Sequence, residues 1–181
     1  MALTTQNIKL LLTGIEILDG DNGIRCIKDF PELDPSSEPD QIEITTLCDE
    51  YHQYISGVKT LPETLEFTAN YNEEVFGFIS GIEEYDEDSS YDEGDVVRKD
   101  GVVYQCNTDE TTGTWDSTKW DAVVVELLIC ESTSDTSGKN GKFSIAKADI
   151  GVKLVGAGVG DVLEMTYVIK PKSNITFSTV A

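Results

Sequence analysis

The stretch Leu65-Glu66-Phe67-Thr68-Ala69-Asn70-Tyr71 alternates apolar and polar side chains along its whole length. A period of two predicts a half-buried β-strand. The stretch Leu163-Glu164-Met165-Thr166-Tyr167-Val168-Ile169 repeats the pattern near the end of the chain, and residues 123–130 are apolar on both alternating faces. These three segments predict a mainly β fold.

One helix interrupts the strand pattern after Tyr71. Asn70 and Glu73 stand at the spacing of a capping box, which predicts a helix start. The apolar residues that follow recur at positions i, i+3, i+4 and i+7: Val75, Phe78, Ile79 and Ile82. This spacing places them on one stripe, so we expect the helix to lie against the sheet.

A register change is expected later in the chain. Phe143 and Ile145 alternate in one phase, and Ile150, Val152 and Leu154 continue the alternation in the other. The shift falls near Ala148-Asp149, where it suggests a β-bulge.

The composition bounds the functions that the chain can have. Its 181 residues carry 34 acidic and 13 basic side chains, for a net charge of −21. Such a balance offers no basic footprint for tight nucleic-acid binding. No apolar run approaches the ~20 residues of a membrane span, and the first residues lack the features of a signal peptide. We therefore expect the protein to fold in a cytoplasm without a membrane anchor.

The four cysteines lie far apart, at positions 26, 48, 106 and 130, without metal-ligand spacing. Disulfides or a nucleophile are alternatives, but reduced, mostly buried thiols are the expectation for a reducing cytosol.

Residues 85–121 differ from the sequence on both sides. Eight of the thirteen residues from Glu83 to Asp95 are acidic, and the segment has its own turns and aromatic residues. Its removal leaves the helix followed directly by a strand. We therefore expect residues 1–84 and 122–181 to form one discontinuous β-domain, with 85–121 as a small inserted β module.

The segments outside the insert resemble the major tail tube proteins of long-tailed bacteriophages. The residues that carry the likeness are Ile42-Glu43-Ile44-Thr45-Thr46-Leu47, Tyr54-Ile55-Ser56-Gly57-Val58-Lys59, the stretch from Leu65 to Tyr71, and residues 156–169 followed by Pro171 and Ile175-Thr176-Phe177. The resemblance covers about 140 residues and lies in their order and spacing rather than in a single motif.

This resemblance implies a β-sandwich or barrel with one flanking helix. Six copies would close into a ring, and stacked rings would form the tube of the virion tail. The tube would assemble in the host cytoplasm with other tail proteins and would conduct DNA without binding it specifically. A lumen lined with carboxylates would repel the duplex. Ring closure would pair sheet edges that are bare in the single subunit.

The loop between two strands, residues 48–60, reaches the neighbouring ring in that family. Here it is rich in aromatic and apolar residues for an exposed loop: Tyr51, His52, Tyr54, Ile55 and Val58. Interfaces favour such side chains, so we expect an inter-ring contact. The alternative is that they cover the core of their own subunit.

The insert resembles a small chitin- or cellulose-binding module of the type found in bacterial chitinases. The similarity lies in Tyr91-Asp92-Glu93-Gly94-Asp95-Val96-Val97, Gly101-Val102-Val103-Tyr104 and a closing Trp120, although the usual leading tryptophan is absent. Such modules stack sugar rings on exposed aromatic side chains. We expect Trp120, Tyr91 and Tyr104 in the core of the module, and Trp115 as the candidate glycan contact. The insert would project outward, since it would block the lumen.

Nothing in the sequence predicts catalysis, a metal site or a cofactor. Gly156-x-Gly158-x-Gly160 lacks the residues of a phosphate loop, and Asp19 to Gly23 lacks the glutamate that a calcium loop requires at its twelfth position. His52 is the single histidine. We therefore expect a structural virion protein rather than an enzyme. The alternatives are a carbohydrate-binding adhesion protein of the virion surface and a tube subunit of a contractile injection device.

Overall fold

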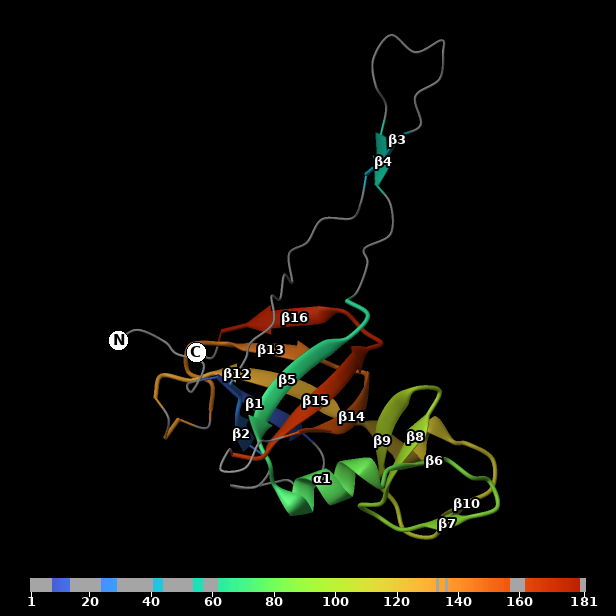
Figure 1. Cartoon of the computed structure of the whole chain (residues 1–181). Helices are drawn as coiled ribbons and strands as arrows, with labels where there is room; N and C mark the ends of the chain where they lie inside the picture. The colour runs from blue at the N-terminus through green and yellow to red at the C-terminus, as the bar shows by residue number, and fades with distance from the viewer. Residues whose placement is uncertain are drawn as a thin grey trace, which may run out of the picture.

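The structure is a computed structural model. It describes residues 8–13, 24–28, 41–43, 54–56, 62–132, 134–135, 137–156 and 162–179, with the backbone alone at 24–25, 41–43 and 54–56. The fold is mainly β, as the alternating segments predicted (Figure 1).

The largest sheet has five antiparallel strands. Their order across the sheet is β16 (Ile175–Ser178), β13 (Lys142–Ile145), β12 (Val124–Ile129), β1 (Ile8–Thr13) and β2 (Ile24–Cys26). Strand β1 precedes the insert and β12 follows it, and the two pair along six residues from Ile8 opposite Ile129 to Thr13 opposite Val124.

A second antiparallel sheet has three strands in the order β14 (Ala148–Val155), β15 (Glu164–Pro171) and β5 (Leu65–Asn70). Here again a strand from before the insert, β5, pairs with one from after it, β15. The two sequence segments are therefore interleaved in both sheets rather than folded as separate halves.

One hydrophobic core lies between these two sheets. Its buried side chains point inward from alternate positions, as Phe67 and Tyr167 do from paired positions of β5 and β15. The five-stranded sheet contributes Leu10, Leu12, Val125, Leu127, Ile145 and Ile175. The burial of these alternating residues stabilises the sandwich by about 25 cal/mol for each Å² of apolar surface removed from water.

The helix α1 (Glu73–Ser80) packs on this core through Val75 and Ile79. Its N-cap is Asn72, whose Oδ1 accepts a hydrogen bond from the backbone N–H of Val75 at 2.9 Å. The expectation of a cap at Asn70 was wrong, because Asn70 is the last residue of β5 and its backbone continues the ladder with β15.

The register change after Ile145 has a cause other than a bulge. Strand β13 ends at Ile145 and β14 begins at Ala148, and the two belong to different sheets. The bend at residues 146–147 carries the chain from one sheet to the other. Ile145 of β13 and Ile150 of β14 both point into the same core, so the phase of the alternation changes between the two strands, and Leu154 near the end of β14 is exposed. The expected bulge at Ala148-Asp149 is therefore corrected to a sheet crossing.

Residues 83–122 form a sheet of their own, which begins two residues before the expected insert 85–121 and ends one residue after it. We call residues 83–122 the inserted module. The strand order of this sheet is β11 (Trp120–Ala122), β9 (Val102–Cys106), β8 (Val96–Lys99) and β6 (Glu83–Glu84), and β6 runs parallel to β8. A small second sheet pairs β10 (Thr111–Thr112) with β7 (Ser90–Tyr91), and a 3₁₀ turn, η3 (Ser117–Lys119), precedes β11.

The β8–β9 hairpin is a two-residue turn with positive φ at both residues, 52° at Asp100 and 70° at Gly101. This is the backbone of a type I′ turn, for which Asp-Gly is a favoured pair.

A last pair of strands, β3 (Gln41–Glu43) and β4 (Tyr54–Ser56), forms an antiparallel ladder. In Figure 1 this two-stranded sheet lies away from the two main sheets.

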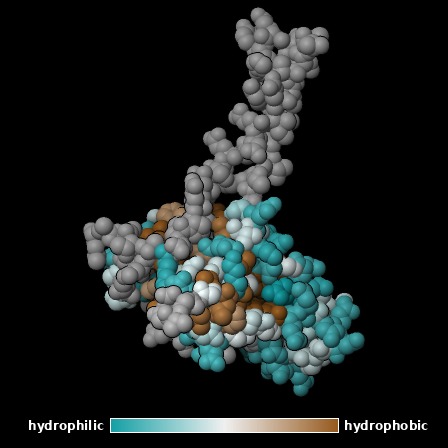
Figure 2. Space-filling view, viewed as in Figure 1, coloured by the Kyte–Doolittle hydropathy of each residue, from teal (hydrophilic) through white to brown (hydrophobic). Residues whose placement is uncertain are grey.

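Charge is distributed unevenly over these parts. The inserted module holds thirteen acidic and three basic residues, whereas the other described side chains comprise nine acidic and eight basic ones. On the face shown in Figure 2 the module is largely hydrophilic, and the apolar surface lies on the main β-domain. The described side chains of the main domain are therefore close to charge balance.

Candidate functional site

The inserted module is built around five aromatic rings. Trp120 is at the centre and only 4% exposed. Tyr85 and Tyr91 meet it edge to face, with ring centroids 5.6 Å and 5.3 Å away, and Trp115 stacks on it at 5.1 Å with an interplanar angle of 16°. Aromatic pairs in such geometries contribute about 1 kcal/mol each beyond their burial. The cluster therefore holds together a module that is small for an independent core.

Trp115, the candidate glycan contact, is half-buried. Besides stacking on Trp120, it meets the rings of Tyr85 and Tyr104 at centroid distances of 4.9 Å and 5.0 Å. Trp120 is buried as expected, but Tyr91 and Tyr104 are half-buried like Trp115. Burial alone therefore does not distinguish a platform ring from the supporting rings. The arrangement fixes the orientation of a partly accessible indole, which is what stacking on a sugar requires.

Tyr85 is the member of this cluster that sequence reasoning left out. It contacts Tyr91 and both tryptophans, and its hydroxyl donates a hydrogen bond to the backbone oxygen of Gly113. Burial raises the pKa of Tyr85 above its ordinary value of 10.0, and nearby Tyr91 and acidic groups raise it further. At neutral pH Tyr85 is therefore a neutral hydrogen-bond donor. The position of Tyr85 at the start of the insert was the sequence feature that could have identified it as a member of the cluster.

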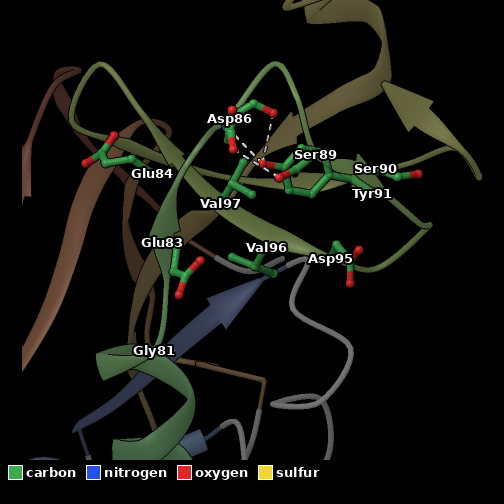
Figure 3. A pocket seen from close by; sticks show the side chains of 10 residues that line it. All are labelled: Gly81, Glu83, Glu84, Asp86, Ser89, Ser90, Tyr91, Asp95, Val96 and Val97. Carbon is green, nitrogen blue, oxygen red and sulfur yellow. Dashed lines mark hydrogen bonds between the residues drawn. The ribbon is translucent and has the colours of Figure 1, made fainter. Parts of the chain in front are cut away.

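A hollow of about 350 Å³ adjoins the aromatic cluster at Tyr91 (Figure 3). It lies between the end of α1, β6, β7 and the start of β8, and four carboxylates line it: Glu83, Glu84, Asp86 and Asp95. Two of them stabilise turns. Asp86 accepts hydrogen bonds from the N–H of Asp88 and from the Ser89 hydroxyl, and Asp95 accepts one from the N–H of Asp92. Within the described ranges no group of three or more possible ligands has the geometry to hold a metal ion.

One arginine joins the inserted module to the main β-domain. The Nε of Arg98, on β8, donates to Oδ1 of Asp149 on β14 at 2.7 Å. Its two terminal nitrogens donate to the backbone oxygens of Ile82 and Ile150, each at 3.1 Å. No sequence pattern predicts this contact, because an isolated arginine in a strand resembles any solvent-exposed arginine.

Two further contacts connect the inserted module to the main β-domain. Val103 of β9 is fully buried in the core of the main domain, and its backbone oxygen accepts a hydrogen bond from the N–H of Val123 at 3.0 Å. The module is therefore packed against the sandwich and is not tethered only by its two chain connections.

Most of the residues expected at the inter-ring contact lie outside the residues that the structure describes. Tyr54 and Ile55 lie on β4, where the backbone alone is described. Tyr51, His52 and Val58 lie outside the described residues, so the inter-ring contact stays a prediction.

Three cysteines are described, and none of these forms a disulfide. Cys106 and Cys130 are buried and Cys26 is exposed, while Cys48 lies outside the described ranges. Burial raises the pKa of the Cys130 thiol, so this thiol is a poor nucleophile.

No helix in the described part of the chain is long and apolar enough to cross a membrane. Comparisons of the chain with known protein families, with curated proteins and with solved structures found no match.

Proposed function

We propose that this chain is a structural subunit of a bacteriophage tail tube, in which it polymerises as stacked hexameric rings. The observation that carries the proposal is the interleaving of strands from both sides of the insert, β1 with β12 and β5 with β15, around a single core. A sandwich of this kind with one helix on its core is the fold that the sequence resemblance implies.

Two features of the surface support self-assembly. Strand β16 is an edge of the five-stranded sheet and carries no charged residue, although charge is the usual protection of an exposed edge. Four large hydrophobic side chains are exposed on the main domain: Leu154 (51%), Val162 (65%), Leu163 (36%) and Phe177 (45%). Contacts with identical neighbours would cover both features.

The β3–β4 pair supports a contact between rings. Isolated two-stranded hairpins are marginally stable in water. Because this pair lies away from the two main sheets in Figure 1, a neighbouring subunit is the surface on which it would be stabilised.

Electron microscopy of the purified protein at high concentration tests the proposal. Hollow tubes or hexameric rings are expected, and only monomers or irregular aggregates at all concentrations would overturn it. A variant lacking residues 49–57 should keep its circular dichroism spectrum and fail to form tubes. Trp115→Ala is the matched control, because it alters the outward module and should leave tube formation intact.

A second candidate function is glycan binding by the inserted module, and the stack of Trp115 on Trp120 favours it. The test is sedimentation of the protein with insoluble chitin, with cellulose, and with bacterial cell walls. Depletion by one of these polymers that is lost in Trp115→Ala is the expected result. If the unmodified protein remains in the supernatant with all three, the module has another role.

A further inference from the structure

The connection between β12 and β13, residues 131–141, is a polar hairpin whose described groups are bonded to one another. The carboxylate of Asp135 accepts hydrogen bonds from the N–H groups of Glu131, Ser137 and Lys139 and from the Ser137 hydroxyl. The ammonium of Lys9, on β1, donates to the backbone oxygen of Asp135 at 2.6 Å. These bonds hold the described residues of the hairpin together and against the outer face of the five-stranded sheet.

We expect the described surface of this hairpin to bind other molecules weakly, for two reasons. None of the exposed large hydrophobic side chains of the described chain lies in it. Its described charges are paired or satisfied internally: Lys139 with Glu131, and Asp135 within the loop. The described side chains that face solvent are all polar: Glu131, Ser134, Ser137, Lys139 and Asn140.

The inserted module fixes which side of the subunit faces outward. Arg98 and the buried Val103 hold it rigidly on the main domain. A module of this size would block a channel that has to admit a DNA duplex. In Figure 1 the β12–β13 connection and the module lie at opposite ends of the subunit.

We propose that the β12–β13 hairpin, through its described residues 131–132, 134–135 and 137–141, faces the axis of the tube and forms the surface past which the duplex slides. This rests on the tube function proposed above and assigns the DNA-facing side. A polar surface whose one described lysine, Lys139, is paired with Glu131 suits that role, and in this proposal it takes the place of the carboxylate lining expected from the resemblance. Unpaired lysines would bind phosphates in a salt-dependent manner, and exposed apolar residues would associate with one another across the channel.

Cysteine labelling of assembled tubes tests the orientation. In a Cys26→Ser, Cys48→Ser background, Ser134→Cys places a thiol on the hairpin and Glu110→Cys places one on the module. Both positions are exposed in the subunit. Each variant is treated, as subunits and as tubes, with N-ethylmaleimide and with a maleimide carried on streptavidin.

The module thiol should react with both reagents in subunits and in tubes. The hairpin thiol should react with both in subunits, but in tubes only with N-ethylmaleimide, which diffuses into the channel. Rapid reaction of the tube's hairpin thiol with the streptavidin reagent would place the hairpin outside. Protection from both reagents would place it between subunits. Either result overturns the orientation while tubes still form, whereas a failure of the background protein to form tubes counts against the tube function itself.

Discussion

Arg98 and Asp149 form a partly buried ion pair between two strands that belong to different sheets, 51 residues apart in the chain. The guanidinium also donates to the backbone oxygens of Ile82, at the end of the α1 region, and Ile150, on β14. A planar group with five donors is suited to this geometry, and lysine cannot reproduce it. Arg98 is therefore the side chain that, together with the buried Val103, fixes the orientation of the inserted module.

Replacing this arginine should loosen the module. Arg98→Ala leaves Asp149 without its closest partner and two backbone oxygens without a donor, so we expect a loss of about 2–4 kcal/mol in the free energy of unfolding. Arg98→Lys should recover only part of it. Urea denaturation measures the change, and limited proteolysis should show faster cleavage near residues 82–85.

The matched control is the ion pair between Lys153 and Glu66, whose side chains are each about half exposed. Exposed pairs contribute little, so Lys153→Ala should cost less than about 1 kcal/mol. Equal losses in the two variants would show that Arg98 has no special structural role.

Asp135 should make the stability of the protein depend on acid pH. Its hydrogen bonds with the N–H groups of Glu131 and Ser137 hold its pKa well below the ordinary value of 3.8. Because the folded pKa is the lower one, the stabilisation is complete above pH 3.8 and is lost as pH falls toward the folded pKa.

Asp135→Asn should therefore be less stable than the unmodified protein at neutral pH, by about 2 kcal/mol. The difference should shrink below pH 3.8, where protonation of Asp135 in the unfolded chain removes the advantage. Thermal unfolding of both proteins from pH 7 to pH 2 measures it. A constant difference over this range would contradict the assigned role of the carboxylate.

The two tryptophans should respond differently to truncation. Trp120 is buried and contacts three other rings, so Trp120→Ala should cost about 3–5 kcal/mol and unfold the inserted module. Trp115→Ala should cost less, because part of that ring is already in water. Near-ultraviolet circular dichroism and urea denaturation distinguish the two variants. An equal loss for both would mean that Trp115 is as much a core residue as Trp120.

Strand and helix identities followed from the sequence where a single face of an element is buried. The segments around Phe67 and Tyr167 alternate strictly because one side of each strand faces the core. The exact helix start did not follow, since Asn70 and Asn72 are equally good caps and only the length of the β5 ladder selects between them.

Other features depend on contacts between distant residues, which no local pattern encodes. The sheet crossing at residues 146–147 resembled a bulge, because both produce the same shift in alternation. The contact of Arg98 with Asp149 and Ile150 depends on where β14 lies relative to β8. No strand pattern surrounds Tyr85 in the sequence. Its place in the aromatic cluster follows only from the fold, which brings aromatic residues between positions 85 and 120 together.

Even the addition of one methyl group at Gly141 should destabilise the protein. The φ of Gly141 is +124°, and a Cβ built there would lie 2.7 Å from Cζ of Phe177, on the neighbouring edge strand β16. Gly141→Ala combines this clash with backbone strain, so it should destabilise the protein by about 2 kcal/mol or more. Phe177→Ala removes the ring and should relieve the clash but not the strain. In a double-mutant cycle the loss for Gly141→Ala should therefore be smaller in the Phe177→Ala background than in the unmodified protein. If Phe177 also contacts neighbouring subunits, Phe177→Ala should in addition raise the protein concentration required for tubes, which light scattering measures. Strict additivity of the two substitutions would show that the chain can move Phe177 away from Gly141 at no cost.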